Sequence, residues 1–353
     1  MKVFWCDHCG SVLFFESVQC VKCGHALGFL PDVLDLSSLE PADNGAWRAL
    51  TSQAQGRLYR PCANEREHQV CNWLVPVEDP EPLCTACRLN NTIPDLSAPG
   101  NRERWHKLER AKRRVIYTLL HLRLPMAGVP SEGRPALTFN FLGETPGEPP
   151  VLTGHSRGSI TVSIAEADDV ERERRRVHLN EPLRTLLGHL RHEVAHYYWD
   201  RLIAGNAHLG NFRELFGDET RDYTSALQQY YQNGAPADWH LSFVTAYASA
   251  HPWEDWAETW AHYLHMMDSL ETAASVGMVL RPKHPDAKSL TSNPKSLQDP
   301  TRAGFETILE NWVPLTCAIN ELNRGMGQPD LYPFVLSTRA IEKLRFVHEV
   351  TGG

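Results

Sequence analysis

The stretch TLLGHLRHEVAHYYWDRL spans residues 185–202 and contains the pattern His-Glu-x-x-His at His192, Glu193 and His196. On an α-helix, side chains four residues apart lie on one face, so the two imidazoles can hold one zinc ion. Zinc lowers the pKa of a bound water toward 7, and the carboxylate of Glu193 can take a proton from that water as it attacks a carbonyl. The stretch therefore predicts a helix that carries a catalytic zinc site.

The helix around this motif is predicted to start near Asn180 as N-cap, with Pro182 in its first turn, and to end before Gly205. Helical spacing of apolar residues predicts further helices at residues 104–124, 219–232, 252–270, 302–324 and 336–348. Residues 125–150, rich in Pro and Gly, and the polar residues 281–301 are expected to form loops.

A third zinc ligand must come from elsewhere, because the residues after His196 do not continue into the extended motif HExxHxxGxxH. The segment HPWEDWAETWAH at residues 251–262 offers Glu254 and Glu258, four residues apart on one helical face. We predict Glu254 as the ligand and Glu258 as an acceptor that orients a ligating imidazole through its distal N–H. The alternative for Glu254 is a solvated acid favoured by the helix dipole.

Five stretches of the chain carry a family resemblance that extends over nearly its whole length. They are FWCDHCG at 4–10, TLLGHLRHEVAHYYWDRL at 185–202, FRELFGDE at 212–219, AYASAHPWEDWAETWAHYLH at 246–265 and DLYPFVLS at 330–337. Through them the chain resembles a bacterial family of zinc-binding metallopeptidases with an N-terminal zinc ribbon and, more widely, the gluzincin peptidases. Residues 247–258 are also similar to the corresponding part of Mlc titration factor and of anthrax lethal factor, where a tyrosine stands seven residues before the ligand glutamate. Tyr247 and Glu254 keep that spacing.

The resemblance implies a zinc-dependent peptidase that hydrolyses peptide bonds by metal-activated water. It implies zinc on His192, His196 and Glu254, with Glu193 as general base and Tyr247 as hydrogen-bond donor to the tetrahedral oxyanion. A phenol near the ion can donate to the charge that develops on the carbonyl oxygen, which agrees with that role. The alternative for Tyr247 is an ordinary packed tyrosine.

The fold class expected is α+β. A zinc-ribbon, rubredoxin-like head at residues 1–100 is followed by a mainly α-helical, zincin-like metallopeptidase domain with a small sheet at residues 101–353. Residues 1–95 support the head, because they consist of short strand-like runs separated by Cys, Gly, Pro and Asn.

Eight of the nine cysteines lie between Cys6 and Cys87, which favours metal sites over disulfides in a cytosolic chain. The first four form two Cys-x-x-Cys knuckles, Cys6 with Cys9 and Cys20 with Cys23. Each knuckle turns tightly enough to direct two thiolates at one ion, and the metal supplies folding energy that so short a segment lacks in its core. We predict a structural zinc here, with iron as the other candidate ion.

A second structural zinc is predicted on a looser quartet, Cys62, Cys71, Cys84 and Cys87. Only the last two form a knuckle, while Cys62 and Cys71 are separated by eight residues. His68 could replace one of these ligands. The alternative to a metal site is that Cys62 or Cys71 is simply buried. With the catalytic ion, the chain is predicted to hold three zinc ions.

Several other residues are expected to have structural roles. Core packing, rather than substrate stacking, is expected for Tyr197, Tyr198, Trp199, Trp253, Trp256 and Trp260. Cys317 lies in a helical apolar stretch and is expected to be a packed core thiol. Either a supporting role around the metal site or a surface or capping role is left open for Asp218, Asp255, His240 and His262.

Residues 158–164 alternate small polar with β-branched side chains and predict a strand at an exposed edge of a sheet. Zincins commonly place an edge strand before the HExxH helix, where it pairs with an extended peptide. By that analogy Ser159–Ile164 would bind substrate by β-addition. The alternative is a strand that pairs only within its own sheet.

The charge balance of the 353 residues, 35 Lys and Arg against 43 Asp and Glu, gives a formal net charge of -8. That acidity argues against a surface that coats nucleic acid. No apolar run is long enough for a membrane span or a signal peptide, so a cytoplasmic location is expected. The partner expected is a peptide or protein substrate, with the ribbon head as a scaffold or a protein-docking module.

Two other functions compete with an active peptidase. In the first, the chain is a non-catalytic partner-binding protein whose HExxH zinc is structural, which closed coordination by four protein side chains would favour. In the second, it is a peptidase held inactive because residues 281–301 or the ribbon head cover the cleft.

Overall fold

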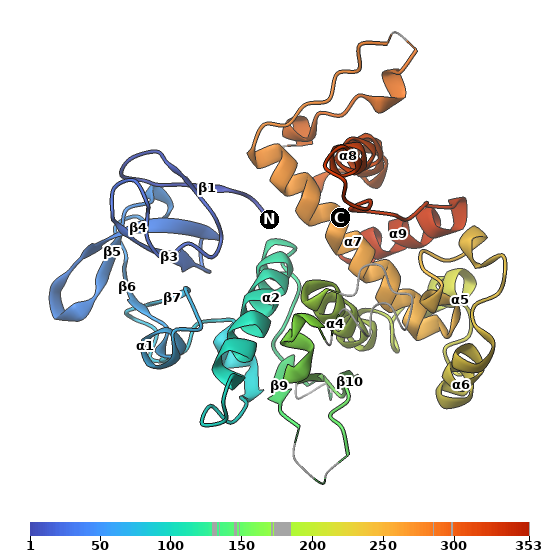
Figure 1. The fold of residues 1–353 in the computed structure, drawn as a ribbon, viewed down its shortest axis with the longest axis horizontal. Coiled ribbons are helices and arrows are strands. Elements are labelled where there is room, and N and C mark those ends of the chain that lie inside the picture. The colour runs from blue at the N-terminus through green and yellow to red at the C-terminus, as the bar shows by residue number, and fades with distance from the viewer. Residues whose placement is uncertain are drawn as a thin grey trace. The chain divides into compact units, whose positions relative to one another are not determined.

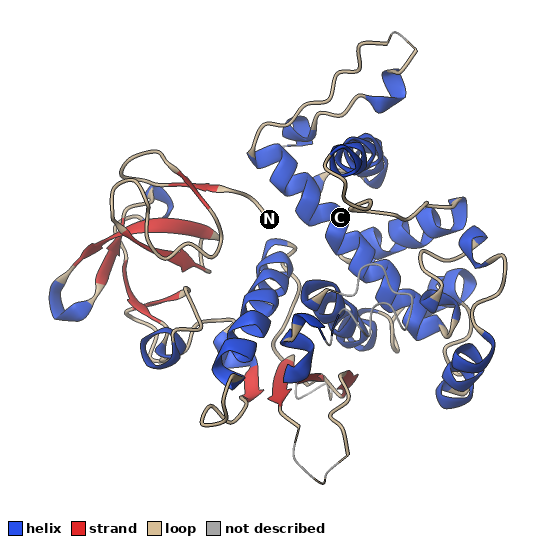
Figure 2. Cartoon of the chain, viewed as in Figure 1, coloured by secondary structure: helices blue, strands red, loops and turns tan. Residues whose placement is uncertain are grey.

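The computed structural model describes residues 1–128, 133, 135–144, 147, 149–170, 172, 185–284, 286–297 and 299–352. They fall into two compact units, one within Met1–Arg175 together with Thr185–Leu187, and the other within Gly188–Gly353. Within these residues, all strands lie in the first unit, and helices dominate the second (Figures 1 and 2). The predicted α+β class, with a cysteine-rich N-terminal region and a mainly helical C-terminal part, is confirmed.

The N-terminal part of the first unit is built from short strands, as predicted. A two-stranded sheet pairs β1 (Phe4–Trp5) with β2 (Val12–Leu13). A five-stranded antiparallel meander follows, formed by β3 (Ala26–Leu30), β4 (Asp35–Pro41), β5 (Trp47–Ala49), β6 (Leu58–Pro61) and β7 (Leu74–Pro76). Its apolar core includes Leu30, Leu39, Tyr59 and Leu74, and helix α1 (Ala63–His68) lies between β6 and β7 in the chain.

A four-stranded sheet closes the first unit and corrects the prediction of an exposed edge strand. Its order is β10-β11-β9-β8, from β8 (Asn90–Thr92), β9 (Thr138–Leu142), β10 (Gly154–Ser156) and β11 (Ser159–Ser163). Strand β11 pairs antiparallel with β10 and parallel with β9, so both of its hydrogen-bonding edges are occupied. Peptide addition to Ser159–Ile164 is therefore wrong, because an interior strand has no free backbone groups to offer.

Helix α2 (Asn101–His121) belongs to the first unit and buries charged as well as apolar residues. The carboxylate of Glu109 accepts hydrogen bonds from Trp105 Nε1 and from Lys112 Nζ, at 3.2 and 2.8 Å. Lys112 also contacts Asn90 of β8, and Arg113 Nη1 donates to the carbonyl of Val70 at 2.5 Å. Because burying a charge is costly unless it is paired, these contacts fix α2 against the strands that precede it.

The second unit is an assembly of helices. They are α4 (Leu186–Leu202), α5 (Leu209–Phe216), α6 (Tyr223–Asn233), α7 (Pro252–Ser275), α8 (Phe305–Gly325) and α9 (Thr338–Val350). All but α5 match predicted segments. The predicted N-cap Asn180 and Pro182 lie outside the described residues, as do parts of the predicted loops 125–150 and 281–301.

Aromatic side chains pack α4 against α7, as predicted. The rings of Tyr198 and Trp260 stack with centroids 4.9 Å apart, and both are fully buried. Trp256 Nε1 donates to the carbonyl of Ala195 at 2.8 Å, so this indole bridges the two helices. Stacked aromatic pairs contribute beyond their buried area, and here they hold the two helices that carry the site in register.

One buried ion pair joins α7 to α9. Lys343 Nζ lies 2.6 Å from Asp255 Oδ2 and 2.7 Å from the carbonyl of Ser242, and both charged side chains are almost inaccessible. Burial raises the pKa of Asp255 to about 7, and it lowers the pKa of Lys343. Asp255, whose role was left open, is therefore a structural anchor.

Cys317 does not have the predicted role. It lies in α8, but its side chain is exposed, so it is not a packed core thiol. An apolar stretch with helical spacing does not show that every residue in it is buried, because α8 buries only one of its faces. Among the described residues, no helix is both long and apolar enough to cross a membrane.

Replacing Lys343 by Met should lower the free energy of unfolding by about 3 kcal/mol, because the carboxylate of Asp255 would stay buried without its partner. Urea unfolding followed by circular dichroism measures the change. The double variant Lys343→Met with Asp255→Leu should be more stable than the single one, since it leaves no unpaired charge. Arg324→Ala, which breaks an exposed ion pair with Asp330, serves as control and should have a much smaller effect. A Lys343→Met protein as stable as the wild type would contradict this account.

Candidate metal centres

Helices α4 and α7 bring the three predicted ligands of the catalytic zinc together. His192 Nε2 lies 3.0 Å from Glu254 Oε2, and His196 Nε2 lies 3.8 Å from Glu254 Oε1. One ligand atom from each of these residues lies within 4.8 Å of the others. The pattern HExxH and a glutamate 58 residues after its second histidine thus meet at one point in space.

The start of α7 explains how Glu254 reaches this point. His251 caps the helix by accepting a hydrogen bond from the backbone N–H of Trp253 through Nδ1, at 3.1 Å, and Pro252 occupies the first turn. Glu254 then lies in the first turn, where the helix dipole favours a negative charge. Its side chain is only 1% exposed, so the alternative of a solvated acid is wrong.

Glu258, one turn further along α7, contacts the distal nitrogen of His192. Its Oε1 lies 2.7 Å from His192 Nδ1, and its Oε2 accepts a hydrogen bond from Thr245 Oγ1 at 2.8 Å. This is the position predicted for the acceptor that orients a ligating imidazole. With the proton of neutral His192 on Nδ1, its Nε2 presents a lone pair toward Glu254.

The contact between His192 and Glu254 tests whether the residues fit a metal ion. Glu254 Oε2 is buried and accepts no regular hydrogen bond from the described part of the chain, yet it lies 3.0 Å from His192 Nε2. Either a proton on the imidazole or a metal ion held by both atoms accounts for a nitrogen and a carboxylate oxygen at this distance. Burial alone would lower the pKa of His192, but Glu254 and Glu258 raise it well above its usual value. A positive charge is thus strongly favoured at this point, and two imidazoles with one carboxylate form a ligand set that suits zinc.

Glu193 and Glu254 are both held in the ionised form. Burial would raise the pKa of Glu193, but His189, whose Nε2 lies 3.2 Å from Glu193 Oε1, lowers it below the usual value. Burial would likewise raise the pKa of Glu254, and the neighbouring His196 and His192 bring it to about 2. Sequence reasoning missed His189, although its place one turn before Glu193 on the same helix was a usable signal.

Two tyrosines complete the surroundings of Glu254. The hydroxyl of Tyr223 in α6 donates a hydrogen bond to Glu254 Oε1 at 2.7 Å. Sequence reasoning missed Tyr223, because no spacing in the sequence links it to the HExxH motif. The ring of Tyr247, in a 3-10 turn before α7, lies 6.0 Å from that of His192 between centroids. Burial, and after it the charge of Glu254, raise the pKa of Tyr247 well above its usual range, so the phenol keeps its proton at neutral pH.

The remaining candidates have other partners. His262 is buried and contacts the Tyr332 hydroxyl through Nδ1 at 2.7 Å, while Asp218 accepts hydrogen bonds from Thr220 in an exposed turn. His240 lies in a short 3-10 turn and is exposed. Among the described residues, none of these three belongs to a cluster that could hold a metal ion.

The first cysteine quartet forms a compact cluster at the start of the chain, from Cys6, Cys9, Cys20 and Cys23. The Sγ atoms of Cys6 and Cys23 lie 3.6 Å apart, as do those of Cys9 and Cys20. Each knuckle closes with a glycine at positive φ: the N–H of Gly10 donates to Cys6 O, and that of Gly24 to Cys20 O. A left-handed residue at this place lets the chain turn tightly enough for both thiols to converge.

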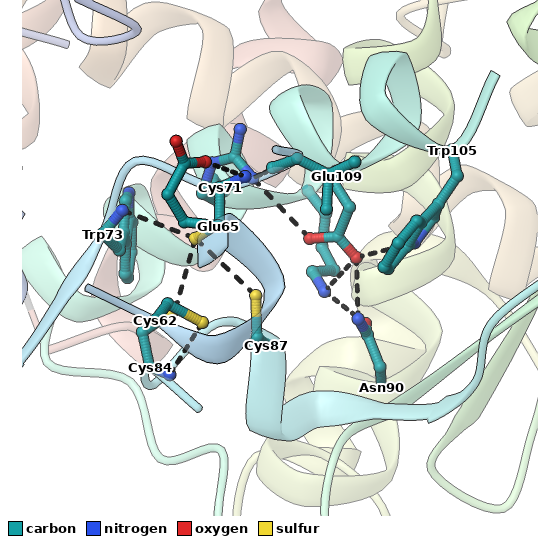
Figure 3. Close-up of polar contacts among 12 residues, drawn as sticks. Cys62, Glu65, Cys71, Trp73, Cys84, Cys87, Asn90, Trp105 and Glu109 are labelled. Atoms are coloured by element: carbon teal, nitrogen blue, oxygen red, sulfur yellow. Dashed lines mark hydrogen bonds and ion pairs between the residues drawn. The ribbon is translucent and has the colours of Figure 1, made fainter. Parts of the chain in front are cut away.

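The four cysteines of the second quartet, Cys62, Cys71, Cys84 and Cys87, are all buried. Figure 3 shows their side chains together with Glu109 of α2. Cys71 Sγ lies 3.7 Å from the Sγ atoms of both Cys84 and Cys87. His68 is not part of this cluster; its ring lies beside Trp105. Burial opposes the charge of Arg113, but Cys71 and Glu109 raise its pKa, so a guanidinium compensates the negative charge of the thiolates. The prediction of a four-cysteine cluster from a single knuckle is thus supported by geometry.

Comparisons with known proteins place both parts of the chain in zinc-binding families. A family model described as "Putative zinc-binding metallo-peptidase" matches residues 101–350, and a zinc-ribbon model matches residues 3–98. Uncharacterised proteins of Mycobacterium bovis and Mycobacterium tuberculosis are each 42% identical over 351 residues, covering 99% of this chain and 95% of the relative. No solved structure matches the chain. The chain therefore belongs to the zinc-binding metallopeptidase family of this model and carries a zinc-ribbon domain at its N-terminus.

Proposed function

We propose that this protein is a zinc-dependent peptidase of the gluzincin type, with zinc on His192, His196 and Glu254. The observation that carries the proposal is the buried, unpaired carboxylate oxygen of Glu254 facing His192 Nε2 at 3.0 Å, with Glu193 on the same helix as both histidines. Within the described residues this cluster has three protein ligands. Structural zinc sites have four, whereas catalytic sites keep one position for water or substrate, so the ligand count favours catalysis over the partner-binding alternative.

When bound, zinc polarises a carbonyl group and lowers the pKa of a water molecule, which makes that water a nucleophile at neutral pH. Glu193 accepts the proton of the attacking water on its carboxylate and later gives it to the leaving nitrogen. The lowered pKa of Glu193 supplies the ionised form that this first step needs. Hydrolysis of a peptide bond requires both such a base and activation of the carbonyl group.

Three further side chains support these groups. His189 holds the carboxylate of Glu193 in place, and Tyr223 holds that of Glu254 through its hydroxyl. Tyr247, protonated and beside His192, donates a hydrogen bond to the oxyanion that develops on the substrate carbonyl. Glu258 keeps His192 in the tautomer that leaves Nε2 free for the metal.

The proposal also covers the binding partners of the protein and its location in the cell. The substrate is a peptide or protein, and the ribbon head, with one structural zinc in each cysteine quartet, serves as scaffold or docking module. The net charge of -8 argues against nucleic acid as a partner. Unpaired cysteines gathered in two metal clusters are typical of a reducing compartment, which supports a cytoplasmic location.

Glu193→Gln should abolish peptide hydrolysis, by a factor of about 1,000 or more, because the amide cannot accept the proton of water. The zinc content should not change, since Glu193 is not a ligand. Proteomic identification of new peptide termini after incubation with each protein measures the first effect, and elemental analysis the second. Glu310→Gln, at an exposed position, is the matched control. Undiminished cleavage by Glu193→Gln would refute the mechanism.

Glu258→Gln should weaken zinc binding at the catalytic centre about 10- to 100-fold, because His192 loses the charged acceptor that fixes its tautomer. Glu254→Gln should weaken it further, since it removes a ligand. Competition against a chromophoric chelator gives the zinc affinity of each variant. If Glu258→Gln bound zinc as tightly as the wild type, Glu258 would have no role in orienting His192 for the metal.

His189→Leu should lower kcat about 10- to 100-fold, the value of a hydrogen bond to a charged group, with KM and zinc content unchanged. His189→Gln, which can still donate to Glu193, should recover part of the loss. Steady-state kinetics on a peptide found in the terminal proteomics separates kcat from KM. A change confined to KM, or equal losses in both variants, would remove His189 from its role in positioning Glu193.

A further inference from the structure

The zinc ribbon contains another group of metal-binding side chains beside its first quartet. His8, Cys23 and His25 each offer a ligand atom, and these atoms lie within 4.8 Å of one another. The rings of His8 and His25 stack with centroids 4.0 Å apart and an angle of 26° between their planes. Two imidazoles and a thiolate are the ligand types that zinc and similar transition metals prefer.

The two knuckles of the ribbon bring these residues together. His8 lies inside the first knuckle, between Cys6 and Cys9, and His25 directly follows Gly24 at the end of the second. Because the knuckles face each other across the four sulfurs, their histidines meet on one side of the cluster. His8 and His25 thus lie close together because of the same backbone turns that direct the cysteines at one ion.

The group formed by His8, Cys23 and His25 differs from the second cysteine quartet in its accessibility to solvent. His8 is exposed, and Cys23 and His25 are half-buried, so an ion can reach all three from solvent. By contrast, the four cysteines of the second quartet are buried, and within the described residues no histidine joins them in a metal-binding cluster. A four-thiolate zinc site carries two negative charges, which attract a further cation at close range.

We propose that His8, His25 and Cys23 form a second, solvent-accessible transition-metal site on the ribbon, in which the sulfur of Cys23 bridges to the ion of the first quartet. A thiolate sulfur keeps lone pairs after it binds one ion, so it can bind a second without leaving the first. The alternative is a stacked pair of imidazoles that packs the two knuckles together and binds no metal ion. This proposal does not rest on peptidase activity, because its ligands lie wholly in the ribbon.

The test is a Zn²⁺ titration of the purified full-length protein, after its resident zinc has been measured. We expect one further equivalent of Zn²⁺ to bind in competition with a chromophoric chelator. His8→Ala and His25→Ala should each weaken that equivalent at least about tenfold, the lower end of what loss of even an outer-shell partner costs a metal site. His284→Ala, which removes another exposed histidine, is the matched control and should change nothing.

The proposal would be overturned if the wild type bound no further equivalent of Zn²⁺. It would also be overturned if both His8→Ala and His25→Ala still bound that equivalent with unchanged affinity. Cadmium-113 substitution tests the bridge directly. Two resonances coupled to each other would support a shared Cys23 sulfur, whereas an additional uncoupled resonance would refute it. The resident zinc content of both variants shows that the ribbon has folded, since the first quartet keeps its four cysteines.

Discussion

The contact between His192 and Glu254 is the constraint on which the helical unit depends. Glu258 accepts a hydrogen bond from His192 Nδ1, and the other ring nitrogen, Nε2, faces the buried carboxylate of Glu254. Such an arrangement needs a positive charge, either on the ring or on an ion held by both groups, and it needs two helices held at a fixed distance. The stacked rings of Tyr198 and Trp260, and the indole of Trp256 bonded to α4, supply that rigidity. The aromatic contacts that pack α4 against α7 and the candidate metal ligands therefore lie on the same two helices.

The sequence predicted the parts of this site that follow from helical spacing. His192 and His196, and likewise Glu254 and Glu258, are four residues apart, so each pair shares a face before any tertiary structure is known. Tyr223 was beyond such reasoning, because its hydroxyl reaches Glu254 from a different helix. Helix α5 was missed because it is short and offers few turns of periodicity.

The errors have a common physical origin, which is that burial and pairing are decided by tertiary contacts. Strand β11 alternates in the way that an edge strand does, yet β9 and β10 occupy both of its sides. Cys317 lies in an apolar run, but on the outward face of its helix. The second cysteine quartet shows the opposite case, since Cys62 and Cys71 are distant in sequence and still converge with one regular knuckle.

Helix α2 places a limit on how modular this protein can be. The two family models meet between residues 98 and 101, which suggests two exchangeable parts. However, Lys112 and Arg113 of α2 find their partners at Asn90 and at the carbonyl of Val70, on the other side of that boundary. Separation at residue 100 would take Asn90 and the Val70 carbonyl away from these two buried cations, which would keep Glu109 of α2. It would also remove a guanidinium from beside the second cysteine quartet. A ribbon of another sequence would therefore have to offer new acceptors to Lys112 and Arg113, so the first helix of the metallopeptidase-family region is matched to this particular ribbon.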